Sequence, residues 1–240
     1  MTAESGGQPA PTRADGVTVA FCPAPPLLLP VVEGRPDADT TALRHACADA
    51  VAAMLAPGPD VVVVVGPGAV GHRFGDGDAG SLHGLGIDLV LPFAGRVRPG
   101  GRTVPLPHLL GAWLLDEAGF AGTRVGTGPD DLAELLHSLP GPVGVLAMGE
   151  GSARRTVKAP GYLDEAAAPF DAAVAAALDA GDPAALAALD AAEGERLLAA
   201  GVPVWQAVGQ ALAGRAVTGR LRADAAPFGV GYLVADWAVR

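Results

Sequence analysis

The sequence has few cysteines, few aromatic residues and few cations, and each shortage argues against a class of function. Only Cys22 and Cys47 occur among 240 residues, so no disulfide framework is predicted and reduced thiols are expected. Lys158 is the one lysine, and the formal net charge is −10. Because a nucleic-acid surface needs clustered Lys or Arg to release counterions, we expect no nucleic-acid partner.

Long apolar runs are also missing. No stretch approaches the roughly 20 consecutive apolar residues of a transmembrane helix. The first fifteen residues lack the apolar region of a signal peptide and are rich in Gly, Pro, Ser and Thr, so residues 1–15 are predicted to be a disordered tail. We therefore expect a cytoplasmic protein without a membrane partner. Half of the residues are hydrophobic, which is enough for one domain over residues 16–240.

What the sequence does contain is an alternation of strand-like and helix-like segments. Apolar runs and their spacing predict strands at 17–22, 60–66, 87–91, 123–126, 143–148 and 229–237, and helices at 39–55, 106–117, 130–137 and across the alanine-rich stretch 163–212. The unbroken valines after Asp60 are typical of a strand covered on both faces. The predicted fold is a single α/β domain with a central, largely parallel sheet flanked by helices on both faces. The strands that start near residues 17, 60 and 143 should be neighbours.

A glycine-rich segment follows the valine strand. Residues 66–71 match the dinucleotide-binding pattern G-x-G-x-x-G, which requires a helix to begin at the loop so that its N-terminus can hold the pyrophosphate. The next residues, 72–80, are rich in glycine and aspartate and do not predict a helix. We therefore favour a flexible glycine loop over a nucleotide site.

Polar residues follow the buried strand 143–148, where open α/β sheets bind their ligands. Glu150 is a candidate ligand or base, Ser152 a candidate hydrogen-bond donor, and Arg154 or Arg155 a candidate anion clamp. An alternative stays open, in which Glu150 and the arginines pair with one another across a surface turn.

Histidine spacing gives no local metal signature. None of the five histidines forms an H-x-H or H-x-x-x-H pair. His72 lies in the glycine loop, and His108 lies close to the start of a predicted helix. Either side chain could still meet a carboxylate in the folded protein.

Several segments together resemble the class III extradiol ring-cleavage dioxygenase (LigB-type) superfamily, which includes Memo-like proteins. They are Phe21-Cys22-Pro23-Ala24-Pro25-Pro26-Leu27-Leu28-Leu29-Pro30, the valine strand with Gly66-Pro67-Gly68, residues 148–155 with 159–164, and the closing residues 226–232. The resemblance covers most of residues 17–238 and is strongest to an actinobacterial branch of that superfamily. It implies a single α/β domain with a largely parallel sheet.

The resemblance also implies a chemistry and the loss of part of it. Active members bind non-haem Fe(II) through two histidines and a carboxylate and cleave catechol-type rings with dioxygen. In this chain the matching histidine positions are Ala24, Ala69 or Val70, and Ala153. Since alanine has no lone pair to donate, we expect no bound metal and no other cofactor.

Two functions therefore stay open. The first is a catalytically degenerate relative that binds a phenolic or anionic small molecule, or a protein partner, in the former cleft. The second is an active Fe(II) dioxygenase with a rearranged site of His72, His108 and Glu150. In either case loops 22–30, 66–86 and 149–162 should converge at the carboxyl ends of the strands, with the second loop as a lid. A homodimer is expected on general grounds.

Overall fold

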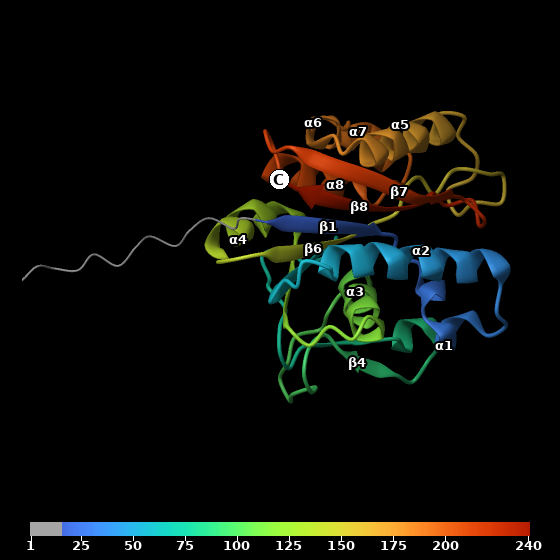
Figure 1. The fold of residues 1–240 in the computed structure, drawn as a ribbon. Coiled ribbons are helices and arrows are strands. Elements are labelled where there is room, and N and C mark those ends of the chain that lie inside the picture. Colours follow the sequence, from blue (N-terminus) through green and yellow to red (C-terminus); the bar gives the residue numbers. More distant parts are fainter. Residues whose placement is uncertain (1–15) are drawn as a thin grey trace, which may run out of the picture.

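A six-stranded sheet forms the centre of the molecule. The computed structural model describes residues 16–240, and the predicted tail 1–15 lies outside the described residues. The strand order is β5-β2-β6-β1-β8-β7 (Figure 1). The bounds are β1 Val17–Cys22, β2 Val61–Val65, β5 Thr123–Thr127, β6 Val143–Met148, β7 Val217–Ala225 and β8 Tyr232–Val239. The first four strands of that order are parallel. β8 is antiparallel to both of its neighbours, β1 and β7. β1 and β2 lie on either side of β6, so the predicted adjacency is confirmed.

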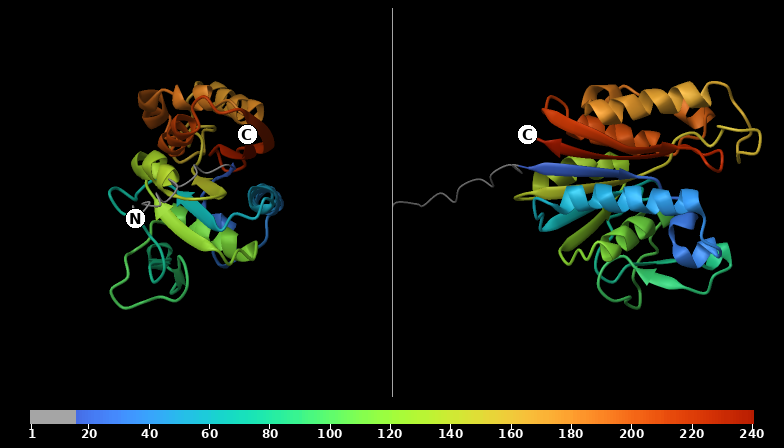
Figure 2. Two further views of the ribbon diagram at one scale, coloured as in Figure 1. Left: turned by 60° about the vertical axis from the view of Figure 1, so that its left-hand side comes forward. Right: turned by 45° about the vertical axis from the view of Figure 1, so that its right-hand side comes forward.

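Helices cover both faces of this sheet, as predicted. One face carries α2 (Ala38–Leu55) and α3 (Leu106–Glu117), with the short α1 (Pro30–Glu33) beside them. The other face carries α4 (Leu132–Ser138), α5 (Ala167–Ala180), α6 (Pro183–Ala187), α7 (Ala191–Arg196) and α8 (Val202–Ala211) (Figures 1 and 2). The chain is thus a single compact α/β body. In residues 16–240 no helix combines the length and the apolar character needed to cross a membrane.

Period-two alternation divides the core into two clusters. In β1, Val19 and Phe21 face one helical layer, while Ala20 and Cys22 face the other. The valines of β2 divide in the same way and are nearly all buried. Residues on both faces of these strands are apolar because both faces are covered. The unbroken valine run is therefore a strand covered on both faces, as the sequence predicted.

Two segments differ from the prediction. The predicted strand 87–91 corresponds to β4 (Val90–Pro92), but β4 pairs with β3 (Ala79–Ser81) in a separate two-stranded sheet. Strand β7 was not predicted, because it lacks an apolar run and contains Gly219. β7 pairs along most of its length with β8, which supplies the hydrogen bonds that its own sequence pattern does not indicate.

Both edges of the main sheet are covered. Outside β5, the backbone of Phe74 exchanges two hydrogen bonds with Gly126, each 2.9 Å from N to O. Outside β7, the carboxylate of Asp179 accepts a hydrogen bond from the N–H of Leu221 at 3.0 Å. Exposed strand edges tend to pair with other chains. These two contacts therefore limit edge-to-edge association.

Candidate functional site

The parallel strands all end at the same edge of the sheet, on the right in Figure 1. Two of the three loops predicted to meet there are in contact. The N–H of Gly149 donates to the carbonyl oxygen of Cys22 at 3.0 Å. The N–H of Ala24 donates to Oε1 of Glu150, also at 3.0 Å. The loops that follow β1 and β6 thus form one unit.

Glycine makes this close approach feasible. A Cβ built on Gly149 would lie 2.5 Å from the Cα of Gly201, so the backbone at the end of β6 touches the backbone at the start of α8. The N–H of Gly201 also donates to the carbonyl oxygen of Glu150 at 2.8 Å. Backbone on both sides therefore fixes the position of Glu150.

The third loop, residues 66–86, is packed into the protein along part of its length. Phe74 is buried against Phe93 and against the edge of His108. The carboxylate of Asp78 accepts hydrogen bonds from the N–H groups of Gly75 and Arg102, at 3.0 and 2.7 Å. These anchors hold the loop beside β5. A lid needs a loop with few buried contacts. These anchors argue against a lid that includes the whole loop, whose longest exposed stretches are residues 70–73 and 83–86.

Glu150 is a half-buried carboxyl group at the carboxyl edge. Burial raises the pKa of Glu150 above its ordinary value, and the hydrogen bond from Ala24 opposes this shift by stabilising the charged form. Burial, followed by the nearby negative charge of Glu150, raises the pKa of Tyr232 to about 12. Both acidic groups therefore hold their protons more tightly than they would in water.

A pocket of about 450 Å³ opens beside Tyr232. Its walls come from the first half of α2 and from the β7–β8 hairpin, and its lining includes Asp39, Leu43, Ala46, Arg222, Pro227 and Tyr232. The guanidinium of Arg222 is held by the carboxylate of Asp236. Most of the lining is aliphatic. The lining also includes Tyr232, the first residue of β8. Ligand pockets typically combine apolar walls with a few polar groups in this way.

Ser152 and Arg155 belong to a buried structural cluster. The Ser152 hydroxyl donates to the carbonyl oxygen of Leu197 at 2.7 Å, and the Ser152 N–H donates to Oδ1 of Asp171 at 2.8 Å. Oδ2 of the same carboxylate accepts from Arg155 at 2.8 Å. Ser152 and Asp171 are fully buried. These groups fix the loop after β6 and do not face a ligand.

Arg154 has a similar structural role. Its guanidinium lies 3.5 Å from a carboxylate oxygen of Asp164, which also binds Arg196. Both candidate clamp arginines are thus neutralised by acids of the chain itself. Among residues 16–240, neither arginine forms an ion pair with Glu150, so the predicted surface pairing is not observed either.

The two candidate histidines lie in different surroundings. His108 is fully buried, and its Nε2 lies 2.8 Å from the carbonyl oxygen of Thr127. Burial lowers the pKa of His108, although this hydrogen bond opposes the shift. The ring packs against Gly66, where a Cβ would lie 3.2 Å from Cε1. His72 is exposed.

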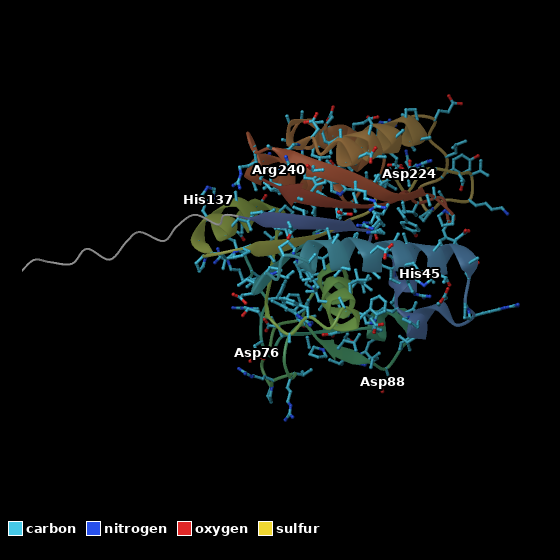
Figure 3. The ribbon with its side chains drawn as sticks, in the orientation of Figure 1. His45, Asp76, Asp88, His137, Asp224 and Arg240 are labelled. Atoms are coloured by element: carbon cyan, nitrogen blue, oxygen red, sulfur yellow. The ribbon has the colours of Figure 1, made fainter. Side chains whose placement is uncertain are left out.

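The structure does not gather a set of metal ligands from these residues. Within residues 16–240, no three His, Cys, Asp or Glu side chains lie close enough together to hold a metal ion. The acidic and histidine side chains labelled in Figure 3 lie on separate elements around the outside of the protein. His72, His108 and Glu150 therefore do not form the rearranged site considered from the sequence.

The three alanines at the positions that the sequence resemblance matches to metal ligands do not fit iron either. Ala24 contributes its backbone N–H to Glu150, and the N–H group has no lone pair to offer a metal. Ala69 is buried with its carbonyl oxygen 2.8 Å from a Cβ built on Gly128, and Ala153 is half-buried. The donor set that Fe(II) requires is not assembled from these residues.

No protein-family model matches this chain, and no curated protein matches its sequence. The geometry of the site is therefore the basis for any functional conclusion. The sequence pointed to Glu150 through its place after a buried strand, but it gave no sign of Tyr232 or Asp171. Tyr232 opens the last strand, and Asp171 lies within a helix whose sequence is ordinary and alanine-rich.

Proposed function

We propose that this protein binds a small phenolic molecule at the carboxyl edge of a LigB-type fold and has lost the iron chemistry of that superfamily. The observation that carries the proposal is a pocket of about 450 Å³ lined by Tyr232. Burial of this phenol, followed by the nearby charge of Glu150, raises its pKa to about 12 and keeps it protonated. A neutral phenol can both donate a hydrogen bond to a ligand hydroxyl and accept one from it. Aliphatic walls can enclose its ring.

The charges near the pocket favour a phenol over an anion. Arg154 and Arg155 are paired with Asp164 and Asp171, and Arg222 is paired with Asp236. An anionic ligand would have to displace one of these carboxylates and would also meet the charge of Glu150 when that group ionises. A neutral hydroxylated ring faces neither cost.

The donor set supports a metal-free protein. The three alanines at the family ligand positions offer no side-chain donor, and His108 is enclosed by Thr127, Phe74 and Gly66. Tight Fe(II) binding by two histidines and a carboxylate would need a rebuilt edge. We therefore propose binding without ring cleavage.

Calorimetric titration with catechols and simple monophenols tests the proposal. We expect saturable binding of at least one phenol, and weaker binding by about tenfold in Tyr232→Phe, which loses one hydrogen bond to the ligand. Tyr162→Phe is the matched control, because Tyr162 is the only other tyrosine and is 64% exposed.

Oxygen uptake with anaerobically reconstituted Fe(II) separates the two candidate activities. We expect no catechol-dependent uptake and no stoichiometric iron by elemental analysis. One tightly held iron per chain together with ring cleavage would reject the metal-free proposal. Absence of binding across the whole phenol panel would reject the pocket as a phenol site.

A further inference from the structure

A cluster of exposed apolar side chains lies at the carboxyl edge, next to the pocket but not part of its lining. Five of the ten exposed large hydrophobic residues in 16–240 belong to it: Val157, Tyr162, Leu163, Leu198 and Phe228. We call these five residues the edge patch. Scattered exposed hydrophobics are ordinary, but a contiguous group on one face marks an interaction surface.

Three chain segments bring the edge patch together. A Cβ on Gly161 would lie 2.6 Å from Cδ1 of Leu198, so the loop after β6 touches the segment before α8. The N–H of Arg155 donates to the carbonyl oxygen of Gly229 at 3.0 Å. The loop after β6 and the β7–β8 turn project side by side in Figure 1 and in the right-hand view of Figure 2.

The edge patch is held rigidly. Asp164 binds Arg154 and Arg196, and Asp171 binds Arg155, so buried or half-buried carboxylates fix both ends of the loop. A surface that is ordered before binding loses little entropy when a partner docks.

Backbone strain points to the same surface. In residues 16–240, Tyr162 and Leu198 are the two non-glycine residues with positive φ, at 60° and 56°. Such conformations are uncommon for side chains of this size and concentrate at functional surfaces. Here both strained residues present apolar side chains to solvent. Their backbones are strained, yet Tyr162 remains 64% exposed and Leu198 48% exposed.

The distribution of charge favours a second copy of this chain as the partner. The whole chain has 16 basic and 26 acidic residues, so two copies repel each other across most faces. Loop 150–165, in contrast, carries Arg154, Arg155 and Lys158 together with Asp164, Glu165 and the half-buried Glu150. Two acidic copies can approach where the local charge cancels. A two-fold axis then places each edge patch on its equivalent.

We propose that the edge patch is the interface of a homodimer. The proposal is independent of the phenol pocket, although the interface would lie near it, because the ring of Phe228 is 6.5 Å from that of Tyr232. In the dimer the apolar side chains of one copy cover those of the other. Lys158 of each copy would lie within the charge-balanced rim.

Sedimentation equilibrium over a wide concentration range tests the interface. We expect the wild-type chain to be a dimer. Val157→Glu and Leu163→Glu should each raise the dimer dissociation constant by tenfold or more, because a charge is placed in an apolar contact. Val70→Glu is the control: Val70 is 81% exposed and lies in the loop after β2.

Thermal unfolding of each variant shows whether it is folded. A wild-type monomer at every concentration would overturn the proposal and leave the edge patch to a different protein. A dimer that survives both patch substitutions but dissociates in Val70→Glu would overturn it too, because the interface would then lie elsewhere.

Discussion

Glu150 and Ala24 are joined across the carboxyl edge by a 3.0 Å hydrogen bond from the Ala24 N–H to Oε1. This bond links the loops that follow β6 and β1, which are 126 positions apart in sequence. A backbone N–H stabilises the charged form of the carboxyl group, whereas burial disfavours it, and burial dominates. The pKa of Glu150 is therefore set by two opposing effects, burial and the hydrogen bond from Ala24.

Replacing Glu150 by Gln tests this balance. Because the folded pKa of Glu150 is raised, its favourable contribution to stability is complete below the unfolded pKa of about 4.5 and is lost as the pH rises through the folded pKa. Glu150→Gln keeps an acceptor for Ala24 and never ionises. We expect it to be more stable than wild type by on the order of 1 kcal/mol near pH 8, with the difference vanishing near pH 4. Urea unfolding at both pH values measures this, with the exposed Glu165→Gln as control.

Asp171 should be important as an acceptor more than as a charge. Burial raises the pKa of Asp171 even though Ser152 and Arg155 both donate to it. Asp171→Ala leaves those two donors without their acceptor and should cost about 3 kcal/mol. Asp171→Asn keeps one acceptor oxygen and should cost about 1 kcal/mol. Equal losses by urea unfolding would contradict this interpretation.

Arg124 joins β5 to the end of α3. Its guanidinium donates to the carbonyl oxygens of Ala112 and Phe120, at 3.1 and 2.8 Å, and lies 2.7 Å from the Asp116 carboxylate. Arg124→Ala should cost about 2–3 kcal/mol, and Arg124→Lys should recover less than half, since a compact ammonium cannot reproduce the fork. Denaturant unfolding compares them, with the exposed Arg220→Lys expected to be neutral.

Gly149 should not tolerate a side chain. Its added Cβ would lie 2.5 Å from the Cα of Gly201, and the atoms that it meets are backbone that cannot rotate away. We expect Gly149→Ala to destabilise the protein by about 2 kcal/mol or more. Gly84→Ala meets nothing within 4 Å and should change stability by less than about 0.5 kcal/mol. Similar melting temperatures for the two variants would show that the β6–α8 contact is loose.

The sequence predicted those elements whose own residues determine them. The strand Val143–Met148 and the helix Leu106–Glu117 were predicted with the bounds observed. The strand is a continuous apolar run, the helix has apolar residues at helical spacing, and turn residues flank both. β7 was missed because its half-exposed residues become a strand only through pairing with β8. A strand that depends on a partner has no local signature.

The candidate site also combines local features that the sequence shows with contacts that only the fold creates. Glu150 was identified from its place after a buried strand, which is a local property. Its contacts with Ala24 and Tyr232, and the binding of Arg155 by Asp171, depend on residues that meet only after folding. The arginines were predicted as an anion clamp because the sequence does not show which carboxylates neutralise them.

The position of β1 has a consequence for the synthesis of the chain. β1 leaves the ribosome first among the strands, yet its neighbours in the sheet are β6 and β8, which are made more than a hundred and more than two hundred residues later. Helix α2 covers the face of β1 that carries Ala20 and Cys22 much sooner, but the two edges of β1 stay unpaired until β6 and β8 are made. Long-range pairing of this kind slows folding and leaves a nascent chain open to misassociation. The last strand of this sheet to be translated, β8, therefore completes the pairing of the first.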